Sequence, residues 1–330
     1  MGAKKGDMQA YRSWCVKNFS GVVCIDEVRD GERTILFATD PLNDFTIAWK
    51  VNSKDDQESM DAFLQQLKDW GINPEVAITD GSSLYKDALK EHWKCIAHQL
   101  CVFHVIKEVN KVILDGVREV KNRLKRLSDR DKKRRRGRPC KGDWWKFRRG
   151  KIRKEQAKFI WENQHLIVKK SENLSGEDKK ALESMFEIAP ELKVFRAFNE
   201  QFYSLFERGI TKEEARRRWE VVVNNRDYQC DSHLAKALRM LSKERFEKMI
   251  VFMDYTNCEM TNNHVERNNR GFRLVQKTRY KRRRAKTIEL AIWLDVLRRW
   301  RKHRLYGESG AAKLYAIPIE ADGCGQKEAA

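Results

Sequence analysis

The first hundred residues alternate between short apolar runs and segments of turn composition, a pattern that predicts a series of strands. β-Branched and aromatic residues are concentrated in the runs, and the short connections favour antiparallel pairing of the first three. The predicted strands cover residues 22–25, 33–39, 45–51, 74–79 and 93–98. Between the third and the fourth, apolar residues recur at three- and four-residue spacing and stop at Gly71, which predicts an amphipathic helix over residues 59–70.

Strand signals end after about residue 112, and helical spacing replaces them. Short helices are already expected over residues 84–92 and from about Phe103. The later helical segments cover residues 156–170, 177–187, 190–208, 212–224 and 231–253. Ser175-x-x-Asp178 and Thr211-x-x-Glu214 match the capping box that begins a helix. Helical spacing returns from Thr261 to Arg304, and the Gly- and Ala-rich end is predicted to be flexible.

The composition indicates a chain that folds and that has a very polar surface. Hydrophobic residues make up 41% of the 330 and charged residues 35%, which excludes a wholly disordered chain. That length allows one substantial core and a second lobe. No apolar run approaches the roughly 18 residues that span a bilayer, and the eight cysteines come without a secretory signal. We therefore expect a cytoplasmic protein with reduced thiols, associated with the nucleoid if prokaryotic, and with no membrane partner.

The net charge of +20 is concentrated in two blocks. Residues 132–154 hold 13 Lys and Arg against one acid, and residues 267–304 hold 15 against two. The rest of the chain carries five more acids than bases. Concentrated basic blocks beside a mildly acidic body are typical of nucleic-acid binding proteins, which neutralise phosphates. A solvated basic segment without a partner is the alternative reading.

Two aspartates are the first candidates for chemistry. Asp26 and Asp80 each follow an apolar run directly, so each carboxylate is expected at the end of a strand. Paired carboxylates at such a place suit Mg²⁺, which prefers oxygen ligands and shares them with substrate phosphates. Solvated turn residues would give the same pattern. The spacing alone leaves both readings open.

A segment near the C-terminus combines an acid with several arginines. In Thr261–Arg273, Asn263 can cap a helix on which Glu266, Asn269 or Arg270, and Arg273 recur at three- and four-residue spacing. An arginine one turn beyond a metal-binding carboxylate can contact the phosphate that is cut. An exposed helix with ordinary ion pairs is the alternative.

The ordered set of these features resembles Mutator-like and hAT transposases and related bacterial insertion-sequence transposases. The set consists of strand-end Asp26, the Ile78-Thr79-Asp80-Gly81 turn, Cys101-x-x-His104, a long helical insertion and a Thr-Asn-Asn-x-x-Glu segment. It spans about residues 22–304. The predicted element order is also that of an RNase H-like core, although periodicity alone does not distinguish this core from other mixed α/β folds.

The resemblance implies an α/β protein whose RNase H-like mixed sheet is interrupted by an all-α insertion and completed by a helical C-terminal segment. We expect the first part of the core over residues 1–112, the insertion over 113–255 with the basic segment 132–154, the core completion over 256–305 and a flexible tail over 306–330. The implied activity is metal-dependent DNA cleavage and strand transfer. Its partners would be element ends and target DNA, joined by a homo-oligomer, with no small-molecule substrate.

By the same resemblance, Asp26, Asp80 and Glu266 are the three acids of a DDE site that holds two Mg²⁺ or Mn²⁺ ions. Glu259 precedes the Thr-Asn-Asn segment and Glu27 alternates to the opposite strand face, so both are weaker candidates. The supporting residues implied are Cys101, His104, Asn262 and Asn263. The string Cys95-x-x-His98-x-x-Cys101-x-x-His104 does not favour zinc, because three-residue steps throughout do not easily close a tetrahedron.

Both basic blocks supply candidate DNA contacts. Arg135-Arg136-Gly137-Arg138-Pro139 resembles the core of an AT-hook, whose arginines enter narrow minor grooves. Aromatic and basic residues alternate just after it, which allows stacking on unpaired bases, although core packing of these aromatics is an equal alternative. The candidates are Arg136, Arg138, Trp144, Trp145, Arg148, Arg149, Arg270, Arg273, Lys277, Arg279, Arg282 and Arg283.

Two other functions fit the same sequence. One is a transposase-derived DNA-binding protein that has lost catalysis, and the other is an RNase H-type nuclease that cuts RNA–DNA hybrids. The first predicted strand begins about twenty residues from Met1, and no module that recognises element ends fits ahead of it. Either the chain is a truncated or split product, or recognition of the ends falls to the insertion and the basic blocks. DNA binding by this chain is therefore expected to depend strongly on salt and weakly on sequence.

Overall fold

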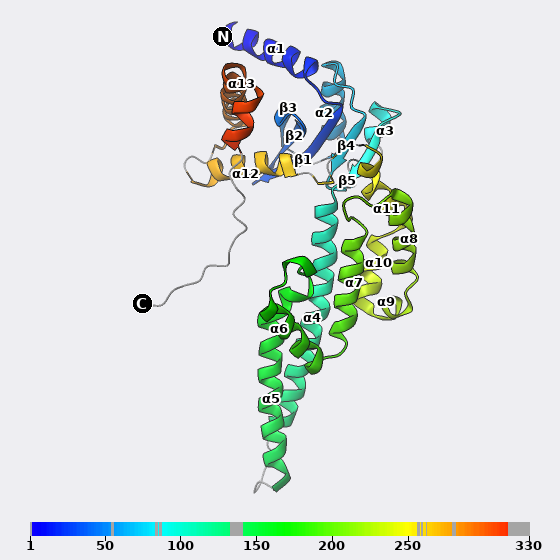
Figure 1. Ribbon diagram of the computed structural model, residues 1–330. Helices are drawn as coiled ribbons and strands as arrows, with labels where there is room; N and C mark the ends of the chain where they lie inside the picture. Colours follow the sequence, from blue (N-terminus) through cyan, green and yellow to red (C-terminus); the bar gives the residue numbers. More distant parts are fainter. Residues whose placement is uncertain are drawn as a thin grey trace. The chain divides into compact units, whose positions relative to one another are not determined.

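The computed structural model describes residues 2–53, 56–82, 85, 88–132, 141–255, 258, 260–261, 263–278 and 282–315. It divides the chain into two compact units. One consists of Met1–His98 with Asn262–Ala330, and the other of Gln99–Thr261. The first contains most of the sheet and the second is helical in its described part (Figure 1). No described helix combines the length and apolar character that crossing a bilayer requires.

The first unit is built on a mixed sheet of five strands. The strands are β1 (Val22–Asp30), β2 (Arg33–Asp40), β3 (Phe45–Asn52), β4 (Val76–Thr79) and β5 (Ala97–Leu100). Their order is β3-β2-β1-β4-β5, with β1, β2 and β3 antiparallel and β4 parallel to β1. The predicted mixed α/β class and the three-strand meander are confirmed. β5 lies a few residues later than predicted.

Strand β1 is longer than the sequence pattern indicates. The apolar run ends at Ile25, but the pairing of β1 with β2 continues to the Asp30–Arg33 pair. Beyond Ile25, β1 is held by its ladder with β2 rather than by an unbroken apolar sequence. Asp26 therefore lies inside a strand instead of just after one.

Helices cover both faces of the sheet. On one face, α2 (Gln57–Asp69) and α3 (Ala88–His92) enclose a core that includes Val23, Ile25 and Phe63. On the other face, α12 (Asn263–Thr278) and α13 (Ala285–Tyr315) pack against β1, β2 and β3. Ring contacts fix this second layer, with centroids 6.2 Å apart for Phe37 and Phe272 and 6.1 Å for Trp49 and Trp293. Strand alternation thus directs odd and even residues of β1 toward different helices.

An N-terminal helix, α1 (Gly2–Lys17), was not predicted. Tyr11 is 2% exposed, contacts the rings of Trp293 and Trp300, and donates a hydrogen bond of 2.5 Å to the carbonyl of Thr46. Apolar residues at positions 11, 14 and 15 have helical spacing and were the available signal. The helix was missed because its buried stripe is this short.

The second unit is helical throughout its described part after β5. Its helices are α4 (Val102–Lys132), α5 (Lys141–Asn163), α6 (Gly176–Ile188), α7 (Leu192–Ser204), α8 (Lys212–Val223), α9 (Arg226–Cys230), α10 (Ser232–Met240) and α11 (Lys243–Met249), with 3₁₀ turns η2 (Gln164–Ile167), η3 (Ser171–Asn173) and η4 (Val251–Asp254). The capping box of Ser175 and Asp178 is present, and the Thr211 side chain accepts from the Glu214 N–H. Helix α5 begins fifteen residues before its predicted start at 156, because its first turns expose their apolar residues and so lack a buried stripe.

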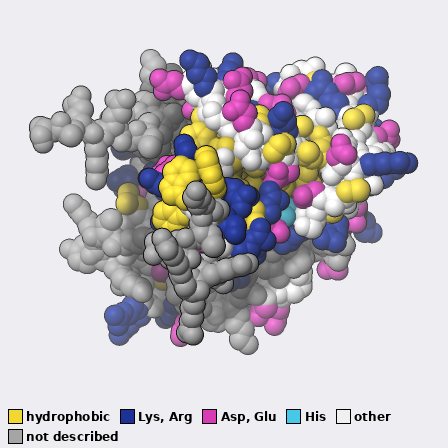
Figure 2. Space-filling view, turned by 90° about the horizontal axis from the view of Figure 1, so that it is seen from below, with side chains coloured by type: hydrophobic (Ala, Val, Ile, Leu, Met, Phe, Trp, Pro, Cys, Tyr) yellow, Lys and Arg dark blue, Asp and Glu magenta, His cyan; other side chains and the backbone are white. Residues whose placement is uncertain are grey.

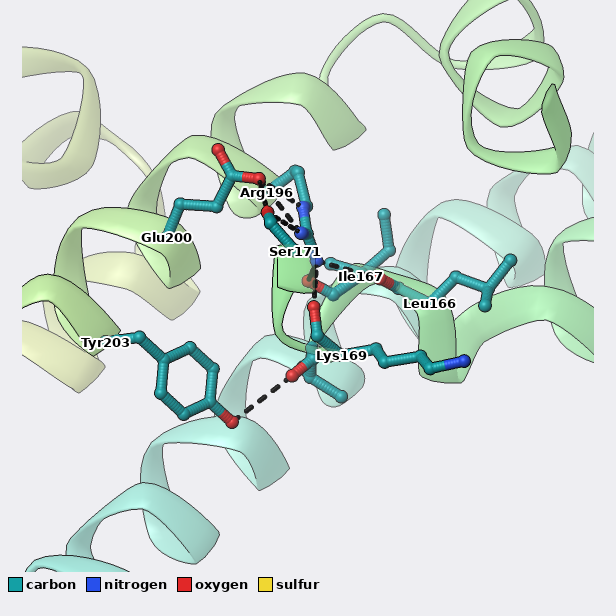
Figure 3. A network of polar contacts seen from close by, with 8 residues as sticks. Leu166, Ile167, Lys169, Ser171, Arg196, Glu200 and Tyr203 are labelled. Carbon is teal, nitrogen blue, oxygen red and sulfur yellow. Dashed lines mark hydrogen bonds and ion pairs between the residues drawn. The ribbon is translucent and has the colours of Figure 1, made fainter. Parts of the chain in front are cut away.

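A buried arginine joins η2 and η3 to α7. Arg196, 5% exposed, donates to the carbonyls of Leu166 (3.0 Å) and Ile167 (3.2 Å) and also to that of Lys169. Its other nitrogens bind Ser171 Oγ at 2.6 Å and Glu200 Oε1 at 2.9 Å (Figure 3). The arginine thereby satisfies carbonyls at the end of η2 that have no helical partner.

Candidate active site

Strand register brings two of the predicted acids together. In the parallel pair, Cys24 of β1 lies opposite Ile78 of β4. Two residues further on are Asp26, still within β1, and Asp80, the first residue after β4. Side chains two positions apart share a strand face, and neighbouring strands lie about 4.8 Å apart. The register therefore sets the two aspartates side by side at the carboxyl end of the parallel pair.

The carboxyl group of Asp26 lies in a buried and negatively charged environment. Its residue is 8% exposed. Burial raises the pKa of Asp26 from the usual 3.8 to about 7; the nearby carboxylates of Asp80, Glu266 and Glu27 raise it too, against a lowering by the backbone N–H of Glu27. Coulomb interactions weaken with distance, so the charges of the other two predicted acids, Asp80 and Glu266, act on Asp26 from nearby.

Helix α12 supplies the third acid. It lies along β1, with Val265 fully buried and Asn269 and Gln276 on the same stripe at four- and seven-residue steps. Asn269 Nδ2 donates to Asp26 Oδ2 at 2.5 Å, and Gln276 Nε2 donates to Asp30 Oδ2 at 2.7 Å. These two bonds fix the helix to the even face of β1. Glu266 lies one turn before Asn269, nearer the N-terminal end of the helix.

Asn269 contacts the candidate site, although the sequence pattern placed it only on the helix of Glu266 and gave it no role. It is 3% exposed, and its Nδ2 hydrogen bond leaves Asp26 with one oxygen committed. Its Oδ1 atom is also buried and has no hydrogen-bond partner in the described part of the chain. A buried amide oxygen without a partner costs free energy unless a donor or cation meets it. The sequence shows that Asn269 lies on the buried stripe of α12, but the spacing along one helix does not show that this stripe faces Asp26.

Asp80 is held by the turn after β4. The Ser82 N–H donates to Asp80 Oδ1 at 2.9 Å, and this short-range bond fixes the carboxylate as in an Asx turn. Just before it, Thr79 Oγ1 lies 2.9 Å from His98 Nε2 and so ties the end of β4 to β5. The turn directs Asp80 by local contacts, whereas Asp26 is directed by a helix far along the chain.

The donor set suits a hard divalent cation. Three carboxylates supply the oxygen ligands that Mg²⁺ and Mn²⁺ take, and a bound cation would offset the charges of Asp80 and Glu266, which add to the effect of burial on the pKa of Asp26. Among the residues that the structure describes, no three Asp, Glu, His or Cys side chains already converge closely enough to hold a metal.

The predicted supporting residues belong to the other unit or lie outside the described residues. Cys101, 1% exposed, and His104, in the first turn of α4, belong to the helical unit. Asn262 lies outside the described residues, and so do the side chain of Asn263 and the weaker candidate Glu259. The supporting roles of these residues stay predictions.

The basic residues of the second block lie on or beside α12. Arg270 and Arg273 are exposed on the helix, and Arg283 is exposed after it. Arg282 is half-buried, with its backbone N–H bonded to Gln276 Oε1 at 3.1 Å. The side chain of Lys277 and the whole of Arg279 lie outside the described residues.

The first basic block forms the start of α5. Trp144 and Trp145 are 58% and 63% exposed, so core packing does not account for them. The Arg148 guanidinium lies 5.5 and 5.9 Å from their ring centres, while Arg149 pairs with Asp131 at 3.1 Å. The AT-hook-like residues Arg136 and Arg138 lie outside the described residues. At the lower end of the helical unit in Figure 1, where α5 begins, hydrophobic and basic side chains lie next to one another (Figure 2).

Comparison with known families finds one match. Residues 23–291 match the model of a family of transposases, the DDE transposases of the ISL3 type. The matched range includes Asp26, Asp80, Glu266 and the whole helical unit. No curated protein and no solved structure matches the chain.

Proposed function

Because the chain belongs to the ISL3 family of DDE transposases, we propose that it cuts element ends and joins them to target DNA with Asp26, Asp80 and Glu266. The observation that carries the proposal is that two acids from distant segments, Asp80 and Glu266, lie near enough to the buried carboxyl group of Asp26 for their charges to raise its pKa. Such convergence of like charges opposes folding and is typical of functional sites. The family has a role in transposition, while the residue roles are our proposal.

The arrangement of strands supports an RNase H-like core. A meander of three antiparallel strands followed by a strand parallel to the first, in the order β3-β2-β1-β4-β5, is consistent with that fold. The helical unit would then be an insertion between the second acid and the third. Fold alone does not decide activity, so the proposal depends on the carboxylates.

Asp26, Asp80 and Glu266 would hold two divalent ions, with Mg²⁺ or Mn²⁺ as the candidates. When bound, such ions activate a water or a 3′-hydroxyl group and stabilise the oxygen that leaves the phosphate. Asn269 would keep one oxygen of Asp26 occupied, so that the other oxygen is oriented for binding. The register of β1 and β4 would keep Asp80 beside it.

Two exposed arginines would hold DNA at the candidate site. Arg270 and Arg273 are exposed on the helix that carries Glu266, and arginine binds phosphate through a fixed fork of donors. They would bind the strand that reaches the acids. Joining two element ends further requires that copies of the chain assemble, and we propose a homo-oligomer for that step.

The proposal is tested by nicking of DNA that carries the element's ends. We expect cleavage with Mg²⁺ or Mn²⁺ by the wild type, and a loss of at least about 100-fold in Asp80→Asn, since each acid acts as part of one unit. Asp69→Asn is the matched control, because Asp69 is an exposed acid at the end of α2. Equal cleavage by the wild type and Asp80→Asn would refute the catalytic role, and preferential cutting of RNA–DNA hybrids would favour an RNase H-type nuclease.

A further inference from the structure

A groove runs between α4 and α5 in the helical unit. It has a volume of about 620 Å³. Five of its nine lining residues are lysines and two are acids. The lining residues are Lys121, Lys125, Asp129, Lys151, Lys154, Glu155, Ala157, Lys158 and Trp161. Only two of the five lysines belong to the basic block between residues 132 and 154, so the charge of that block does not by itself explain the groove.

The two helices are held together firmly enough to keep this groove open. They run antiparallel, with Ser128 Oγ bonded to the Gly150 carbonyl at 2.5 Å and Asp131 paired with both Arg149 and Arg153. The polar and charged groups of these residues therefore bond to one another at one end of the groove. The groove is therefore a built feature between two packed helices.

The lysines follow a regular stripe. On α5, basic and aromatic side chains recur at four- and three-residue steps, which places them on one face of the helix. The stripe consists of Phe147, Lys151, Lys154, Lys158 and Trp161. On α4, Lys121, Lys125 and Asp129 face it at four-residue steps. From Lys151 to Trp161 the helix rises about 15 Å at 1.5 Å per residue, which spans about four phosphates of one DNA strand at 3.4 Å each along the axis.

Several ammonium groups in the groove have no ion-pair partner among the residues that the structure describes. Within the described part of the chain, no carboxylate lies within ion-pair distance of Lys125, Lys151 or Lys154, although Lys158 is 3.6 Å from Glu162. Lys121 lies over the Trp161 ring at 4.3 Å. The five lysines outnumber the two acids of the lining, so the groove keeps a net positive charge, and an anion that binds between the lysines relieves their repulsion.

We propose that this groove binds the phosphate backbone of DNA and is a docking surface of the helical unit. The inference rests on the proposed function for the identity of the anion. Lysine binds phosphate as a point charge without reading bases, so the groove would contribute affinity and no sequence preference. The exposed aromatic residues at positions 147 and 161, 49% and 43% exposed, flank the lysines and would contact sugars or unstacked bases.

The test compares two triple variants of the full chain that lose the same charge. The groove variant carries Lys125→Gln, Lys151→Gln and Lys154→Gln. The control carries Lys179→Gln, Lys180→Gln and Lys193→Gln, at exposed positions of α6 and α7. Binding of a fluorescein-labelled 20-base-pair duplex is followed by anisotropy at several salt concentrations, and circular dichroism checks that both variants fold.

We expect the groove variant to bind at least about tenfold more weakly and to lower the salt slope by about 2.7, since each phosphate contact contributes about 0.9. The control is expected to keep the wild-type slope to within about one contact. Equal losses in both variants would refute the groove and attribute binding to net charge. Weaker binding of the groove variant to polyglutamate, without weaker binding to DNA, would also refute the proposal and would indicate an acidic protein partner.

The same experiment separates this inference from the proposed function. Metal-dependent nicking is measured with DNA in excess over its dissociation constant for each protein. If the wild type nicks DNA and the groove variant binds like the wild type, only the groove inference fails. If the wild type binds through the groove but neither it nor any variant nicks DNA, the catalytic proposal fails and the groove remains a DNA-binding surface.

Discussion

The substitution Asp26→Asn is expected to stabilise the protein while it removes activity. In the folded chain, burial first and then the charges of Asp80, Glu266 and Glu27 raise the pKa of Asp26 from 3.8 to about 7. In the unfolded chain the group ionises near its usual value. Above pH 7 the folded wild type must therefore carry an unfavourable charge that a neutral amide at this position would not have. The hydrogen bond from Asn269 can still be accepted by the new amide oxygen.

The magnitude follows from linkage. The difference between 3.8 and about 7 corresponds to about 4 kcal/mol, at about 1.36 kcal/mol for each pKa unit. The folded state binds the extra proton, so this contribution to the stability of the wild type is fully present below about pH 4 and is lost as pH rises from about 4 to about 7. Asp26→Asn is therefore expected to match the wild type near pH 4 and to exceed it by up to about 4 kcal/mol at pH 8.

The assay is urea unfolding with a chelator at pH values from 4 to 8, followed by circular dichroism. Asp69→Asn serves as the control and is expected to follow the wild type at each pH. Added Mg²⁺ is expected to stabilise the wild type at pH 8 but not Asp26→Asn, because a cation binds the carboxylate that the variant lacks. Parallel pH profiles of the wild type and Asp26→Asn would refute the reasoning.

Three further substitutions test other contacts. Gly116→Ala is expected to destabilise the helical unit by about 1–3 kcal/mol in urea unfolding, because its new Cβ would lie 2.7 Å from the Phe195 ring; equal or greater stability would contradict this close approach. Arg196→Met is expected to lower the free energy of unfolding by about 3–5 kcal/mol, because it removes the donor to three carbonyls and a carboxylate. A decrease below about 1 kcal/mol would show that water replaces the guanidinium group. Asn269→Ala is expected to raise the Mg²⁺ concentration for half-maximal nicking by about 10–100-fold, since it frees Asp26 to rotate; an unchanged requirement would exclude a positioning role.

The sequence predicted those parts of the fold whose local pattern matches their environment. Val22–Ile25 and Val76–Thr79 are apolar because both sheet faces are covered there, and the stripe of Met60, Phe63 and Leu67 marks the buried side of α2. The capping box at Ser175 is likewise a local signal. Where a helix buries little, as at the start of α5, or buries a short stripe, as in α1, the pattern was too weak to predict its bounds.

The candidate site likewise contains residues that a local pattern identified and one that it did not. Asp26 and Asp80 were identified because each follows an apolar run in the sequence, and Glu266 because of the Thr-Asn-Asn-x-x-Glu resemblance. Asn269 was not identified as a site residue. Its partner lies 243 positions away, and only the packing of α12 along β1 joins them.

The sequence by itself determined the element types, the concentration of charge and the identity of the candidate acids, because periodicity, composition and motif order are properties of short segments. The tertiary structure decided which side chains from distant segments lie close together. Strand register set Asp80 beside Asp26, burial raised the pKa of Asp26, and the pairing of α4 with α5 assembled lysines from two helices into one groove. Distances between remote segments depend on how layers pack, and no local pattern specifies them.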